Sequence, residues 1–115
     1  MGYRSEVVLA LRPDASILLS TVIARGGPAA SMFDADDVDV EKRPDGSVIY
    51  HWHGIKWYDS YPEIQVVEKF MQRLEDESMD ESYRFVRIGE DTDDSDTRGW
   101  GFDINISRAI EFYDV

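Results

Sequence analysis

Two histidines separated by one residue are the first feature of the sequence that could do chemistry. In His51-Trp52-His53 the imidazoles share one face if the segment is a strand, because side chains alternate between the faces of a sheet. A catalytic zinc ion usually has three protein ligands, and the sequence places no third ligand beside this pair. Metal or small-molecule binding by His51 and His53, together with sheet aromatics, is therefore the alternative function. We expect no cofactor and no metal.

Carboxylates are the second feature, and they gather in three clusters of five residues each. Cluster A comprises Asp34, Asp36, Asp37, Asp39 and Glu41; cluster B comprises Glu75, Asp76, Glu77, Asp80 and Glu81; cluster C comprises Glu90, Asp91, Asp93, Asp94 and Asp96. The simplest interpretation is solubility, because a high net charge keeps a small domain soluble. The functional hypothesis is that the clusters form one negative surface that binds a basic partner.

Part of cluster A has the spacing of a nucleic-acid mimic. Asp37, Asp39 and Glu41 occupy alternate positions of a predicted strand, so their carboxylates would share one face at intervals of about 7 Å. This interval is comparable to that between successive phosphates of a nucleic-acid strand, so we expect the surface to occupy a nucleic-acid-binding groove. Exposed aromatic residues would anchor such an interface. The candidates are Trp52, Trp57, Tyr58, Tyr61 and Trp100.

The common catalytic motifs are missing from the sequence. The chain has no cysteine, which excludes thiolate nucleophiles, thiolate metal sites and disulfides. It also lacks a Gly-x-Ser-x-Gly elbow and a Walker loop. Cluster C fails the EF-hand pattern, because Asp96 stands where glycine belongs and Phe102 where glutamate belongs. The sequence therefore predicts a non-enzymatic protein.

Charge limits the choice of partner. The 24 acidic and 12 basic residues give a net charge of −12, which should repel nucleic acid, so the expected partner is a basic protein. No apolar run approaches the roughly 18 residues that span a bilayer, and the first residues lack the pattern of a signal peptide. We therefore predict no membrane contact and a cytoplasmic location, with the protein a monomer or a homodimer.

The elements that must position these residues follow from periodicity and turn signals. Two helices are predicted: one begins at Pro13 and stops at Gly26, and the other begins at a capping box formed by Ser60 and Glu63. The Pro-Asp-Gly turn at 44–46 predicts a hairpin. The predicted strands are residues 7–11, 38–42, 48–58, 83–88 and 102–112, with loops over 29–35 and 89–99.

The order of these elements predicts an α+β fold. A β-α-β-β-α-β succession followed by one extra C-terminal strand matches the ferredoxin-like plan. We expect a single domain over residues 1–115, with a four- or five-stranded, largely antiparallel sheet and two helices on one face.

Three segments carry a resemblance to a class of proteins. Residues 3–7, 56–58 and 83–91 resemble small acidic proteins of unassigned activity that phages and prophages encode. Proteins similar in size and charge include phage inhibitors of host defence systems that bind nucleic acid, some of which act by nucleic-acid mimicry. The resemblance implies a phage-encoded inhibitor in the host cytoplasm, with a basic host protein such as a defence effector as its partner, and it assigns no role to any residue.

Overall fold

Strand β1 (Ser5–Leu11) is the centre of the fold. The computed structural model describes residues 3–34, 38–91, 93–106 and 110–113. All residues from Val7 to Leu11 are fully buried, on both faces of the strand. An uninterrupted apolar run forms such a strand because both of its faces can be covered. Two layers of the protein therefore pack against β1, one on each side.

The sheet has five antiparallel strands in the order β2-β3-β1-β4-β5. The strands beside β1 are β2 (Val38–Lys42), β3 (Val48–Ile55), β4 (Tyr83–Ile88) and β5 (Ser95–Gly99). The turn between β2 and β3 has the predicted chemistry. Gly46 has a φ of 96°, and the carboxylate of Asp45 accepts hydrogen bonds from the backbone N–H and the hydroxyl of Ser47. The predicted hairpin is confirmed.

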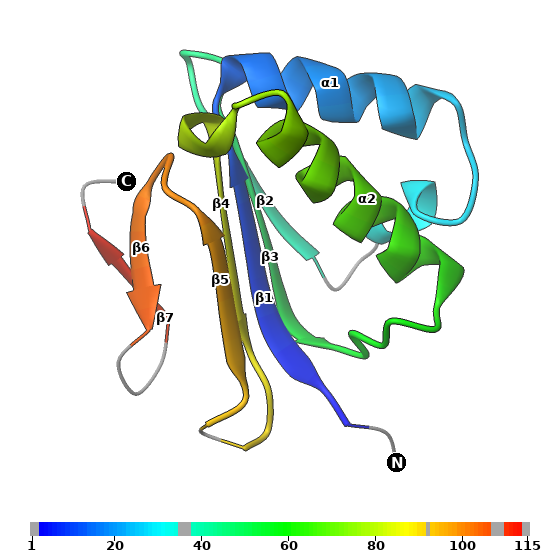
Figure 1. Ribbon diagram of the computed structural model, residues 1–115, viewed down its shortest axis with the longest axis vertical. Helices are drawn as coiled ribbons and strands as arrows, with labels where there is room; N and C mark the ends of the chain where they lie inside the picture. The colour runs from blue at the N-terminus through cyan, green and yellow to red at the C-terminus, as the bar shows by residue number, and fades with distance from the viewer. Residues whose placement is uncertain (1–2, 35–37, 92, 107–109, 114–115) are drawn as a thin grey trace.

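Both helices lie on one face of this sheet, as predicted (Figure 1). Each begins with proline, α1 (Pro13–Ala24) and α2 (Pro62–Asp76), because a first-turn position needs no backbone N–H. The predicted capping box is wrong: Tyr61 precedes the first turn of α2, and no side chain caps the helix. Among the described residues, no helix has the length and apolarity to cross a membrane.

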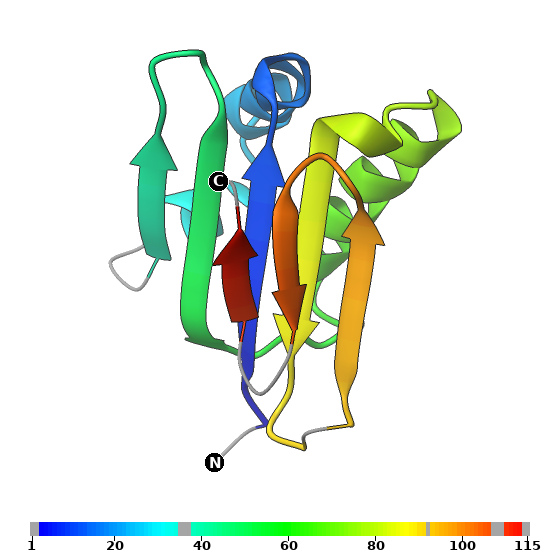
Figure 2. The same cartoon turned by 90° about the vertical axis from the view of Figure 1, so that its left-hand side faces the viewer.

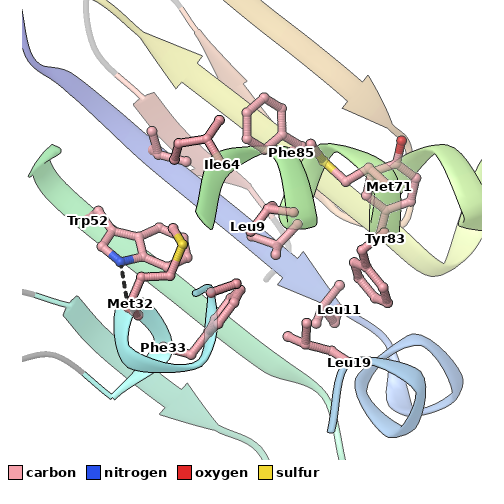
Figure 3. Packing of buried hydrophobic residues seen from close by; sticks show 14 of the residues in the cluster. Leu9, Leu11, Leu19, Met32, Phe33, Trp52, Ile64, Met71, Tyr83 and Phe85 are labelled. Atoms are coloured by element: carbon pink, nitrogen blue, oxygen red, sulfur yellow. Dashed lines mark hydrogen bonds between the residues drawn. The ribbon is translucent and has the colours of Figure 1, made fainter. Parts of the chain in front are cut away.

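The core between the helices and the sheet is aromatic. Trp52 of β3 lies under a short 3-10 helix, η1 (Ala30–Phe33), and its indole N–H donates to the backbone carbonyl of Met32 at 3.0 Å (Figure 3). The ring of Phe33 meets that of Trp52 edge-on at 5.6 Å between centroids. The apolar stripe of α2, predicted from its helical spacing, is buried here. It consists of Ile64, Val67, Phe70, Met71 and Leu74.

The opposite face of the sheet is covered by a hairpin that the sequence did not reveal. Residues 102–112, expected to form one strand, instead include β6 (Asp103–Ile106) and β7 (Ile110–Tyr113), which pair in a separate two-stranded sheet (Figure 2). Phe102 and Ile104 pack against the second face. That face presents Val8, Ala10, Ile49 and Val86.

The stretch 89–99, expected to be a loop, contains the edge strand β5. Three strands therefore follow β4 in the described part of the chain, where one was expected. The structure confirms an α+β fold with an antiparallel sheet and two helices.

The hairpin can be tested by removing its buried side chain. Because Ile104 is fully buried, Ile104→Ala should lower the free energy of unfolding by about 2–5 kcal/mol, measured from urea denaturation. The matched control is Ile17→Ala on the exposed side of α1, which should change it by no more than about 0.5 kcal/mol. Equal stabilities of the two variants would show that the hairpin does not cover the sheet.

Candidate functional site

The histidine pair acquires two carboxylate partners in the fold. His51 and His53 lie on the sheet face that carries the β6–β7 hairpin, and their rings stack with centroids 4.0 Å apart. Nε2 of His51 is 2.7 Å from Oε2 of Glu6, and Nε2 of His53 is 2.6 Å from Oδ2 of Asp39. Asp39 belongs to cluster A, whereas Glu6 could not be predicted as a partner, because only the β1–β3 register brings it opposite the histidines.

A bulge in β3 sets this register. Ser5 pairs with Ile55 and Val7 pairs with Trp52, so Glu6 alone faces two residues, His53 and Gly54. An extra residue in one strand twists the ladder locally and re-aims neighbouring side chains. The ligand atoms of Glu6, His51 and His53 all lie within 4.8 Å of one another. Two imidazoles and a carboxylate are a donor set that a transition-metal ion can use.

The described members of the three acidic clusters lie on different elements of the fold. Cluster B ends at Glu81, before β4 begins, and cluster C starts at Glu90, after β4 ends. The six residues of β4, about 20 Å of strand, separate Glu81 from Glu90, so the end of cluster B and the start of cluster C lie at opposite ends of β4 (Figure 1). Of cluster A, Asp39 and Glu41 lie on β2, at the sheet edge opposite β5, and Asp34 follows η1. A single negative surface formed by all three clusters therefore stays a prediction.

Part of the acidic charge is used inside the protein. The paired members are Asp39 with His53, Glu41 with Arg43, Glu75 with Arg98, Glu77 with Arg73, and both Asp94 and Asp96 with Arg87. In the described part of the chain the members without an ion pair are Asp34, Asp76, Asp80, Glu81, Glu90, Asp91 and Asp93. Asp36 and Asp37 lie outside the described residues.

A cleft of about 740 Å³ opens between α2 and strands β4 and β5. The guanidinium of Arg98 on β5 reaches Glu68 and Glu75 of α2 at 2.7 and 3.0 Å. The guanidinium of Arg87 contacts Asp94 and Asp96 at 2.6 and 2.8 Å. These ion pairs connect the polar strand β5 to α2 and to β4. Apart from Asp59, the charged residues that line the cleft are thus ion-paired within the chain.

The ion pairs change the pKa values of carboxylates that they join. The Arg87 guanidinium lowers the pKa of Asp94 to about 2 by donating hydrogen bonds to the carboxylate. Hydrogen bonding from Arg98 likewise lowers the pKa of Glu75. Burial raises the pKa of Tyr83, whose hydroxyl donates to the Glu75 carboxylate. The two arginines therefore keep Asp94 and Glu75 ionised to a lower pH than an isolated carboxylate.

Trp100 is the exposed member of the candidate aromatics. Trp52 and Trp57 are buried in the core and Tyr58 and Tyr61 are partly buried, whereas Trp100 is 71 % exposed.

Two glycines flank Trp100. Gly99 has a φ of 72°, and a side chain at Gly101 would come within 2.8 Å of the Glu81 carbonyl. The backbone N–H of Trp100 donates to the carbonyl of Asp80 at 2.9 Å, which places the tryptophan beside cluster B.

Two arginine side chains donate hydrogen bonds to the backbone of residues 99–101. The guanidinium of Arg12 donates to the carbonyl of Gly101 at 2.9 Å, and that of Arg84 donates to the carbonyl of Gly99 at 2.6 Å. These bonds fix the backbone on both sides of Trp100. The exposed indole of Trp100 is therefore attached to a turn whose backbone is held by hydrogen bonds.

Comparisons of the chain with protein-family models, curated proteins and solved structures found no match. The resemblance to phage-encoded proteins therefore stays a prediction. The arrangement of side chains is the basis for assigning a function.

The Arg87–Asp94 pair predicts a particular loss of stability in acid. The ordinary pKa of Asp94 is 3.8 and its folded value is about 2, so its ionised form stabilises the fold above pH 3.8. That contribution disappears as the pH falls from 3.8 towards about 2. Urea midpoints measured across this interval should fall less steeply for Asp94→Asn than for the wild type. Asp93→Asn is the control, since Asp93 has no ion pair among the described residues, and parallel curves for all three proteins would contradict the prediction.

Proposed function

We propose that the protein is a non-enzymatic interaction module that binds a cationic segment of another protein through Trp100 and the neighbouring carboxylates of cluster B. The observation that carries this proposal is the outward position of Trp100 on a turn that its backbone contacts hold in place. As expected from the net charge, the proposed partner is a basic protein. The proposed contact surface lies at one end of the sheet and does not include all three clusters.

An exposed tryptophan is the kind of residue that contributes most to binding. Tryptophan is enriched among interface residues whose truncation weakens binding strongly, because a partner that covers the indole removes a large apolar surface from water. The bonds to the backbone of residues 99–101 support this role, since a contact residue that is already positioned loses little freedom on binding.

The charges beside Trp100 favour a cationic partner. Asp80 and Glu81, whose backbone carbonyls lie against residues 100 and 101, have no ion pair within the described ranges, so their charge is available to a partner. Lysine and arginine side chains also bind to the face of an indole ring. A basic segment could therefore pair with the carboxylates and cover the ring together. The net charge of −12 would speed its approach at low ionic strength.

Nucleic-acid mimicry is not part of this proposal. Mimicry requires available carboxylates at regular spacing along β2. There Asp39 forms an ion pair with His53, and Glu41 forms one with Arg43. Asp37 lies outside the described residues.

For the fold, we propose that the part from β1 to β4 follows the ferredoxin-like plan. Two features support it: the order β2-β3-β1-β4, and the two helical connections, each of which passes over one intervening strand. On this proposal, β5 and the β6–β7 hairpin are additions to that plan.

Truncation of the tryptophan tests the contact residue. Trp100→Ala should weaken capture of the cationic partner by about 2 kcal/mol or more, roughly 30-fold in affinity, and should leave the melting temperature unchanged because the side chain is exposed. Val40→Ala on β2, at the other edge of the sheet, is the exposed apolar control. Retained binding by Trp100→Ala would remove the tryptophan from the interface.

A pair of charge-matched variants tests where the partner binds. Asp80→Asn/Glu81→Gln and Asp91→Asn/Asp93→Asn each remove two negative charges, but at opposite ends of β4. The first variant should lose at least about 10-fold in affinity, whereas the second should show only the weaker effect of a reduced net charge. Surface capture of the partner at low and high salt measures both. Equal losses would mean that the partner responds to overall charge and not to cluster B.

A further inference from the structure

We propose that Glu6, His51 and His53 form a binding site for a divalent transition-metal ion of the zinc type. The site lies on the sheet face opposite the helices and shares no residue with the Trp100 surface. It is therefore independent of the proposed function. The third ligand that the histidine pair lacks in the sequence is supplied by the neighbouring strand β1.

The distances are close to those of a coordination shell. Zinc bonds of about 2.0–2.2 Å in a tetrahedron place ligand atoms roughly 3.3–3.6 Å from one another. Here the ligand atoms of Glu6, His51 and His53 lie within 4.8 Å of one another, and Glu6 and His51 are joined by a 2.7 Å hydrogen bond. A metal ion would replace the proton of that hydrogen bond, and side-chain shifts of about 1 Å would bring the ligand atoms to the tetrahedral separations.

The backbone that carries the ligands is held in place. Glu6 is followed directly by the fully buried part of β1, and the histidines flank Trp52, whose side chain is anchored in the core on the other face. The bulge at His53 and Gly54 places both residues opposite Glu6 on β1. A site on central strands loses little freedom when it binds an ion, which favours affinity.

Asp39 supplies the outer partner that such sites use. A metal-bound histidine usually gives its second ring nitrogen to a carboxylate, which orients the ring. Asp39 contacts Nε2 of His53 at 2.6 Å. In the proposed site, Nδ1 of His53 would bind the ion, and Nε2 would keep its contact with Asp39. With Glu6 and Asp39 the site holds two negative charges, which offset those of a divalent ion.

The donor set and the exposure favour one class of ion. Imidazole nitrogens suit Zn²⁺, Ni²⁺ and Cu²⁺, whereas Mg²⁺ and Ca²⁺ prefer oxygen ligands. The His51 side chain is 19 % exposed and that of His53 is 60 % exposed, so the site is open on the side of His53. Water can reach an ion there and complete its coordination.

Calorimetric titration of the full-length protein with Zn²⁺ alone tests the site. We expect one ion to bind per chain, and His53→Ala and Glu6→Gln should each lower the affinity at least about 10-fold. Asp91→Asn/Asp93→Asn is the control for nonspecific attraction: it removes more negative charge than Glu6→Gln and should bind Zn²⁺ like the wild type. Addition of Co²⁺ should give the visible absorption of a nitrogen-ligated ion, which His53→Ala should lose.

Two results would overturn the metal site. One is weak binding of several Zn²⁺ ions that all variants share, and the other is competition by Mg²⁺ at equal concentration, since either indicates attraction to carboxylates in general. If a variant fails to fold, the ring-proton NMR signals of His51 and His53 in the wild type decide the question. They must both shift on addition of one equivalent of Zn²⁺, and unchanged signals would show that the contacts are only histidine–carboxylate pairs.

Discussion

The structure depends on the need to cover β1 on both faces. The side chains from Val7 to Leu11 are all buried, and no single layer can cover both sides of a strand. The helices cover one side, where Leu9 and Leu11 pack against α1 and α2. The β6–β7 hairpin covers the other, where Val8 and Ala10 meet Phe102 and Ile104. The position of β1 also brings Glu6 beside the histidines of β3, so the same constraint that organises the core creates the candidate metal site.

Acidic residues have two different roles in this molecule. Glu68, Glu75, Asp94 and Asp96 neutralise the arginines of the cleft and hold β5 in the sheet, and a partner could use them only by breaking those pairs. The carboxylates of Asp80 and Glu81 near Trp100 form no ion pair with an arginine in the described structure. A net charge alone does not distinguish the two groups, because it counts a paired carboxylate and an available one equally. The distinction is what directs the functional proposal to one end of the sheet.

Elements with a strong apolar pattern were predictable, and elements held by polar contacts were not. Strands 38–42 and 83–88 were predicted with the boundaries that the structure has, as was the buried stripe of α2. Strand β5 has the sequence Ser-Asp-Thr-Arg-Gly, which resembles a loop, and it forms because β4 offers a free edge and because Arg98 reaches α2. The isoleucines at 104, 106 and 110 suggested one strand, since their spacing does not reveal that the chain reverses between them.

Composition and local pattern were enough to establish the acidic character, the α+β class, the hairpin at Pro-Asp-Gly and the pairing of His51 with His53 on one face. These properties depend on residues that are neighbours in the chain, and their physical causes act over a few residues. The third ligand Glu6, the separation of the clusters and the exposure of Trp100 depend on contacts between residues that are distant in sequence. Such contacts follow from strand order and register, which arise when the whole core packs, and they could not be obtained from any local segment.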